Sequence, residues 1–242
     1  MNTGVEKIVA VGNRVDRLIL DNGEEVQADV VLSSAGLPET LDMCEPQLEL
    51  EKPVSAGRLA FTETISVFKD QPESFGWGDD TIVFFNSRDR FSYREASDPV
   101  DLTSGVICIP NNFQFGDEQM PEGVVRVTCL SNYAKWKGYG EEEYAKCKEQ
   151  WRPRIWEAAK QFMPPSALDY DDACIAHDMF TPTTVEHYTW RKQGAIYGAP
   201  QKSKDGTTPI SNLFICGTDQ GFLGIVGSML SGIVMANTHA LR

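Results

Sequence analysis

The pattern of apolar and polar positions changes several times along the chain, and each change predicts a different kind of element. Near the start, Val5–Val11 and Val15–Leu20 are β-rich runs separated by a Gly-Asn turn. An Asp-Asn-Gly turn follows, with the positive φ angles that Asn and Gly tolerate. The next run, Glu25–Leu32, ends in three consecutive apolar residues, which is typical of a strand buried on both faces in a parallel sheet. The opening segment therefore predicts an antiparallel meander and then a strand of a parallel sheet.

From Leu37 onward the pattern indicates strands with one buried face. Leu59, Phe61, Ile65 and Val67 share one parity, as expected for such a strand. Three further apolar runs, separated by Pro and Gly residues, are strand candidates: Thr81–Asn86, Val106–Ile109 and Val124–Leu130. The middle of the chain is thus predicted to be a sheet-rich unit.

A period of three and four residues predicts one long helix from about Glu141 to Met163. Its apolar stripe consists of Tyr144, Cys147, Trp151, Ile155, Ala158 and Phe162. Pro153 removes a backbone donor inside the helix, so a kink is expected there. A short strand near Cys174–His177 and a turn-rich stretch follow the helix.

The last segment, "NLFICGTDQGFLGIVGSMLSGIVMAN" from Asn212 to Asn237, reads as a short strand, a glycine-rich turn and an uncharged helix starting near Ile225. Glycines at such a junction let a backbone approach a phosphate or a flat ring, and the helix start presents free N–H groups. The spacing is neither GxGxxG nor a Walker loop, so tight strand–helix packing explains these glycines equally well. Asp219 could accept hydrogen bonds from sugar hydroxyls or cap the following turn.

The order of these pieces predicts one domain interrupted by another. Residues 1–36 and 206–242 are α/β-type segments, and residues 37–205 form a different, sheet-rich unit with a long kinked helix. The predicted fold class is α/β, in the mixed α+β sense.

The net charge and the cysteine content of the chain limit its partners and its cellular location. A net charge of −13 over 242 residues argues against nucleic acid, because a phosphate backbone would repel such a surface. Six scattered cysteines without a CxxC pair are typical of reduced thiols in a cytoplasmic protein. No signal peptide is recognisable, and the uncharged run from Gln220 onward contains several glycines, so we read it as a buried core helix rather than a membrane span.

No residue of the sequence stands out as a catalytic group. His177, His187 and His239 lack metal-ligand spacing, and the acidic run near Asp171 lacks the glycine and distal glutamate of a calcium loop. There is no GxSxG elbow and no evident Cys–His pair. We therefore expect no metal and name no catalytic residue.

Four motifs in order resemble the C-terminal half of flavoprotein oxidoreductases of the phytoene desaturase type, a group that includes carotenoid desaturases and isomerases and the retinol saturases. The motifs are "VEKIVAVGNRVDRLILDNGEEVQADVVLSSAG", "IPNNFQFGDEQMPEGVVRVTCLSNYAKW", "FTPTTVEHYTWRKQGAIYGAP" and "NLFICGTDQGFLGIVGSMLSG". The resemblance implies a partial FAD/NAD(P)-binding Rossmann-like domain, residues 1–36 and 206–242, around a substrate domain. It also implies an FAD-dependent oxidoreductase acting on a long apolar polyene or lipid-like substrate.

The resemblance also implies which residues contact the FAD. Gly217 and Asp219 would lie beside its ribityl and pyrophosphate portion. The helix start beneath the pyrimidine edge of the flavin would be formed by Gly224, Ile225, Val226 and Gly227. The helix dipole would there stabilise an anionic reduced flavin.

One departure from the family shapes the expected partners. Members of the family begin with a GxGxxG strand–turn–helix, which this sequence lacks. We therefore expect a separate N-terminal FAD-binding half as a partner, beside an apolar small-molecule substrate, and leave open a peripheral contact with a membrane. The alternatives are a non-enzymatic module that binds apolar ligands, a truncated inactive remnant, or an amine-oxidase-like flavoprotein.

Overall fold

The computed structural model describes residues 3–50, 52–114, 116 and 118–241. The chain packs as two compact units, one formed by the residues up to Gly57 together with those from Glu186 onward, the other by Arg58–Val185. The chain returns to the first unit within helix α5, Pro182–Thr189. The predicted limits of the cofactor and substrate domains lie elsewhere, after residues 36 and 205, and that functional division stays a prediction.

The first unit contains the predicted meander. Its four-stranded sheet has the order β3-β2-β1-β5, in which β1, β2 and β3 are antiparallel neighbours and β5 runs parallel to β1. The strands are β1 (Val5–Val11), β2 (Arg14–Leu20), β3 (Glu25–Val26) and β5 (Cys44–Glu45). The predicted antiparallel meander is therefore confirmed. Its two turns carry the Gly and Asn residues that tight hairpins need.

A second, two-stranded sheet in the same unit joins the two ends of the chain. Strand β4, Val31–Ser33, pairs in parallel with β11, Leu213–Ile215. The predicted parallel strand is confirmed, but its burial on both faces is wrong: all three residues of β4 are only half-buried. The reason is that β4 has β11 as its only neighbouring strand in the described part of the chain.

The core of the first unit is small. Buried apolar residues form two clusters, one of Ile8, Ala10, Val15, Cys44, Ile210 and Leu213, the other of Leu37, Leu41 and Ile215. Helix α1, Leu37–Asp42, supplies part of the second cluster. The buried amide of Asn212 accepts from the backbone N–H of Val15 at 2.7 Å and donates to the carbonyls of Val15 and Asp29. This side chain thereby joins the end of the chain to the meander.

The second unit is built on a five-stranded sheet with the order β10-β6-β9-β8-β7, antiparallel throughout. Its strands are β6 (Ala60–Phe68), β7 (Ile82–Asn86), β8 (Val100–Cys108), β9 (Gly123–Ser131) and β10 (Cys174–Phe180). All five were predicted. Strand β8 begins six residues earlier than expected. The sequence did not show this start, because the first half of the strand is largely polar and its pairing with β9 is irregular between Val100 and Gly105.

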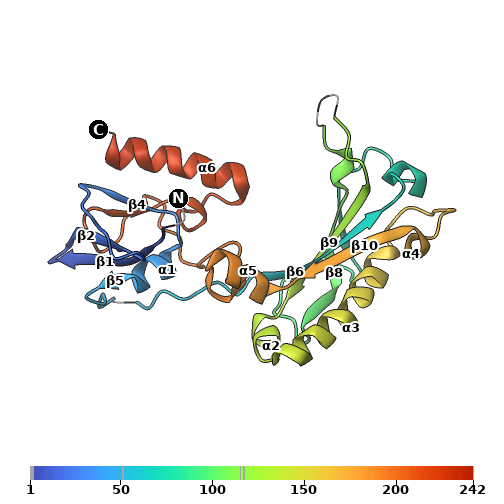
Figure 1. Cartoon of the computed structure of the whole chain (residues 1–242), viewed down its shortest axis with the longest axis horizontal. Helices are drawn as coiled ribbons and strands as arrows, with labels where there is room; N and C mark the ends of the chain where they lie inside the picture. Colours follow the sequence, from blue (N-terminus) through green and yellow to red (C-terminus); the bar gives the residue numbers. More distant parts are fainter. Residues whose placement is uncertain (1–2, 51, 115, 117, 242) are drawn as a thin grey trace. The chain divides into compact units, whose positions relative to one another are not determined.

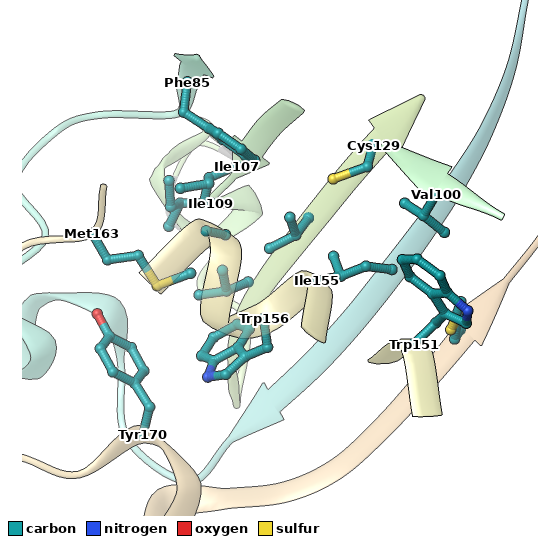
Figure 2. Close-up of a cluster of buried hydrophobic side chains, with 14 of the residues drawn as sticks. Phe85, Val100, Ile107, Ile109, Cys129, Trp151, Ile155, Trp156, Met163 and Tyr170 are labelled. Atoms are coloured by element: carbon teal, nitrogen blue, oxygen red, sulfur yellow. The ribbon is translucent and has the colours of Figure 1, made fainter. Parts of the chain in front are cut away.

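Helix α3, Glu141–Lys160, covers one face of this sheet (Figure 1). The helix runs through Pro153 and buries Cys147, Trp151, Ile155, Trp156 and Ala159. Figure 2 shows Ile155 and Trp151 beside Val100 of the sheet. The ring of Trp156 lies on the side of Tyr170. The predicted stripe is confirmed in its middle, whereas Ala159 rather than Ala158 is fully buried near the end of the helix.

Short helices complete the two units. Besides α1 and α3, the α-helices are α2 (Tyr133–Lys137), α4 (Tyr170–Ala173), α5 and α6 (Gly224–Met235). The 3-10 turns are η1 (Pro72–Phe75), η2 (Pro110–Asn112), η3 (Lys192–Gly194) and η4 (Gly217–Gln220), and one π turn, η5, spans Ala236–Ala240.

Helix α5 corrects the prediction that the stretch after β10 consists of turns. The Thr-Pro pair at its start is a favourable helix opening, since Pro is tolerated in a first turn. The hydroxyl of Thr184 accepts a hydrogen bond from the backbone N–H of Thr181 there. The signal was therefore present in the sequence.

Candidate cofactor site

The turn between β11 and α6 depends on three glycines in left-handed conformations. Gly217, Gly221 and Gly224 have φ angles of 83°, 120° and 75°, which other residues adopt only with strain. Strand β11 ends at Ile215, η4 begins after Cys216, and α6 begins at Gly224. The predicted strand–turn–helix is confirmed, with the helix starting one residue before the expected position.

The carboxyl ends of β4 and β11 meet at this turn. The backbone N–H of Cys216 donates to the carbonyl of Ser33 at 2.9 Å, so both strands end at the same edge. Beyond β4, Gly36 has a φ of 111° and α1 begins at Leu37. In open α/β sheets, ligands bind outside the carboxyl ends of parallel strands. The two ends of the chain thus build one edge of that kind.

Open space lies beside two of the turn glycines. A Cβ added to Gly217 or Gly224 would meet no atom within 4 Å apart from its chain neighbours and, at Gly224, the adjoining backbone of α6. Gly227 differs, because a Cβ there would come within 3.1 Å of Phe222, so this glycine serves close packing inside the molecule. The openness at the first two glycines is what a flat ring or a phosphate needs for a close approach to a backbone.

The first turn of α6 is exposed and uncapped. Its N-cap residue, Leu223, makes no side-chain hydrogen bond to the helix. Ile225 and Val226 are 84% and 69% exposed. Because the first N–H groups of a helix have no partner inside it, this end favours an electron-rich atom or an anion. The predicted set Gly224, Ile225, Val226 and Gly227 therefore lies together at a helix start, and its contact with a flavin stays a prediction.

Asp219 occupies a different position from the other predicted residues. Its side chain is fully buried, and its carboxylate accepts from the backbone N–H of Leu37 at 2.6 Å and of Ala199 at 2.8 Å. Lys202 Nζ lies 3.2 Å and Arg191 Nη1 3.5 Å from its oxygens. The carboxylate joins three separate segments of the first unit, and its role toward a sugar stays a prediction.

Sequence reasoning missed the cations around Asp219. Arg191 also lies 3.8 Å from Glu39, and both side chains are mostly buried. The stretch that carries Arg191 is strained, since Trp190 and Gln193 have φ angles of 59° and 60°. The only signal in the sequence was the Trp-Arg-Lys-Gln-Gly run inside the third motif.

No reactive thiol or metal cluster accompanies this edge in the residues that the structure describes. Burial raises the pKa of the Cys216 thiol, which keeps it protonated near neutral pH. His239 stacks on Phe214, and one of its ring nitrogens is 2.8 Å from the carbonyl of Asp205. Across the described residues, no group of His, Cys, Asp and Glu has the arrangement of a metal site. Likewise, none of the described helices has the length and apolar character needed to cross a membrane.

Known proteins resemble this chain in sequence and in fold. No protein-family model matches the chain. In sequence, the chain is 24% identical over 284 aligned residues to the all-trans-retinol 13,14-reductase of Danio rerio, across 96% of this chain and 46% of that protein.

Two solved structures are similar in fold. An oxidoreductase from Methanosarcina mazei has a TM-score of 0.56 at 12% identity, covering 97% of this chain and 49% of that one. The PF1083 protein of Pyrococcus furiosus is a looser match, with a TM-score of 0.48 at 12% identity over 99% of this chain and 47% of that one. The mixed α/β class is confirmed, and the chain spans about half the length of the proteins it resembles.

Proposed function

We propose that this chain is the half of a flavin-dependent oxidoreductase that closes the flavin site and contacts the substrate. The observation that carries the proposal is the edge where β4 and β11 end together above an open glycine turn and an uncapped helix start. The 24% identity with a retinol reductase across nearly the whole chain supports the oxidoreductase class. The cofactor we propose is FAD, and the substrate a long apolar polyene or a similar lipid.

The residues of the chain have distinct tasks in this proposal. The backbone of Gly217 and Gly224 gives the cofactor room, because no side chain fills the space beside either residue. The N–H groups at the start of α6 stabilise negative charge on the ring edge above them. Asp219 holds the surrounding segments in place through its four donors.

When bound, the flavin would supply the exchange of a hydride with a substrate carbon. The chain's own contribution is therefore positioning and electrostatics. Accordingly, we assign no acid–base residue.

A matched pair of glycine variants tests the proposal. Gly224→Ala places a methyl group in the open space, and we expect flavin affinity to fall by about tenfold or more, equivalent to about 1.4 kcal/mol. Gly23→Ala is the control, because Gly23 is also exposed, has a φ of 82° against 75° at Gly224, and has equally open surroundings. Both variants carry similar backbone strain, so only the position relative to the flavin differs.

The measurement is a titration with FAD, followed by visible absorbance and flavin fluorescence, on the chain joined to an N-terminal FAD-binding half. Equal affinities for the two variants would count against the proposed site. Binding of retinoid without any flavin colour would instead favour a module that binds apolar ligands.

A further inference from the structure

Trp190 differs from the other tryptophans of the chain. It is 85% exposed, whereas the other four, which all lie in the second unit, are 1% to 7% exposed. A large aromatic side chain left in water forgoes the stabilisation that burial would give it. Exposed tryptophans of this kind are typical of surfaces that contact a ligand or a partner.

The backbone at Trp190 is strained as well. Its φ of 59° lies in the left-handed region, and its N–H donates to the carbonyl of Glu186, four residues earlier, at 2.8 Å. This geometry is the αL motif that ends a helix, and its left-handed position is usually occupied by glycine, because other residues adopt it with strain. Glycine would therefore suit the fold better than tryptophan here. Strain of this kind persists at ligand-binding sites, where the surrounding structure holds it in place.

Hydrogen bonds from side chains fix the backbone that follows Trp190. The N–H of Lys192 donates to the carboxylate of Glu39 at 2.8 Å, and the N–H of Gln193 donates to that of Glu186 at 3.0 Å. These contacts hold the strained loop in one conformation, so the exposed indole stands on a rigid support. A preorganised contact of this kind loses little conformational entropy when a ligand binds.

Arg191 joins this loop to the candidate cofactor site. Its Nη1 lies 3.5 Å from the carboxylate of Asp219 in the turn after β11. The same nitrogen lies against Gly36 in the turn after β4, so closely that Gly36 has no room for a Cβ. Those two turns form the edge at which β4 and β11 end. Trp190, the residue before Arg191, is therefore separated from that edge by no more than one arginine side chain, within the first unit.

The cations beside Trp190 already hold carboxylates. Arg191 lies between two acidic side chains and is only 15% exposed, and Lys192 forms an ion pair with Asp42. A ligand at this position thus meets an aromatic ring whose charged neighbours are paired with one another. Such a surface favours an uncharged, flat molecule over an anion, because stacking on an indole needs a flat π-system and no counter-charge.

We propose that Trp190 is a ligand-contact residue, whose indole stacks on the flat, conjugated part of an uncharged apolar molecule beside the cofactor edge. Its role is to bind and orient that molecule. The proposal rests on the proposed function for the class of molecule, a polyene or a similar lipid. The alternative occupant is a second copy of the chain, since exposed tryptophans also anchor protein interfaces. Self-association is therefore measured as well.

Two glycine variants of the 242-residue chain separate binding from folding. Trp190→Gly removes the indole and relieves the φ of 59°, whereas Gln193→Gly relieves a φ of 60° at another exposed residue and keeps the indole. Because glycine adopts such angles without strain, we expect neither variant to melt below the unaltered chain. Only Trp190→Gly should lose ligand affinity, by at least fivefold.

The probe is all-trans-parinaryl alcohol, an uncharged conjugated tetraene whose fluorescence rises in apolar surroundings, titrated without flavin. Octadecanol, the saturated alcohol of the same length, is the competitor. We expect it to bind at least threefold more weakly, because a saturated chain cannot stack on the indole. Caesium quenching of tryptophan emission reports on Trp190, since the other tryptophans are buried. Bound tetraene should halve this quenching or reduce it further.

Several results would overturn the proposal. They are no binding of the tetraene, equal affinities of the two glycine variants, equal affinities for the tetraene and octadecanol, or unchanged caesium quenching. A melting temperature of Trp190→Gly below that of the unaltered chain would assign the indole to the fold instead. A homodimer in light scattering that Trp190→Gly abolishes would assign it to a second copy.

The flavin site is judged separately by the variants at Gly224 and Gly23. Tetraene binding that depends on Trp190, together with equal FAD affinities of those two variants, refutes the proposed function alone. Loss of FAD affinity in Gly224→Ala, together with tetraene binding that Trp190→Gly leaves unchanged, refutes the role of Trp190 alone.

Discussion

Helices α3 and α6 are the two longest helices in the described part of the chain, but their surfaces differ sharply. Helix α3 buries five residues against its sheet and carries charged side chains on its outer side, as an amphipathic helix does. Helix α6 is uncharged, buries two residues and exposes most of its apolar side chains. The chain thus completes one hydrophobic core and leaves another open.

The same difference extends to the two units. The second unit is held by one large apolar cluster in which α3 meets the sheet (Figure 2). The first unit has two small apolar clusters and depends more on buried polar groups, above all Asp219 and Asn212. A unit that buries little apolar area gains little hydrophobic stabilisation, so each polar contact carries a larger share.

The largest expected difference in stability is between an alanine variant in α3 and one in α6. Ile155→Ala removes a fully buried side chain from α3 and should lower the free energy of unfolding of the second unit by about 2–5 kcal/mol. Ile233→Ala, at a position of α6 that is 56% exposed, should change the stability of the chain by about 0.5 kcal/mol or less. Urea denaturation followed by tryptophan fluorescence and circular dichroism measures both. A comparable loss in the two variants would mean that α6 is already covered.

Asp219→Asn tests the polar framework of the first unit. The change leaves Lys202 without its buried counter-charge and Arg191 with Glu39 alone. It also places an amide against two backbone donors. We expect a loss of about 3 kcal/mol in the free energy of unfolding of this unit. Asp16→Asn is the control, because the ion pair of Asp16 with Arg17 is exposed and contributes about 1 kcal/mol or less. Thermal melting should separate the variants; identical curves would remove Asp219 from the framework.

Asn212→Ala should have a somewhat smaller effect. It leaves the buried N–H of Val15 without its acceptor, which costs about 1–3 kcal/mol. Amide hydrogen exchange at Val15 should accelerate more than at strand positions of the second unit. Unchanged protection at Val15 would show that the amide of Asn212 does not stabilise the meander.

The smallest expected effect lies on the outer side of α3. Lys146→Ala removes an exposed ion pair with Glu142, four residues earlier on the helix, and should cost about 0.5 kcal/mol or less. The midpoint of urea denaturation should barely move, and adding salt should reduce even that shift. A loss of more than about 1 kcal/mol would place this pair among the contacts that hold the second unit.

Local patterns predicted most of the elements because their causes are local. The meander follows from β-rich runs and from glycine turns. Strand β6 follows from the shared parity of its apolar residues, the next three strands of its sheet along the chain from short apolar runs, and α3 from its apolar stripe. Helix α5 was missed because its Thr-Pro opening lies among many turn-forming residues. The burial of β4 was wrong because apolar composition indicates what a strand could bury, whereas the neighbours that the chain supplies decide what it does bury.

Part of the candidate site could likewise be predicted from the sequence, and part could not. Its glycines and the start of α6 were recognisable from a strand running into an uncharged helix, since positive φ angles and free helix N–H groups are properties of short segments. The partners of Asp219 were not, because Leu37 lies 182 residues and Ala199 20 residues away from it along the chain. Contacts across such separations arise only when distant segments pack together. For this protein, the sequence determined the kinds of element and where they change, and the tertiary structure alone decided which of them meet and which apolar surfaces stay open.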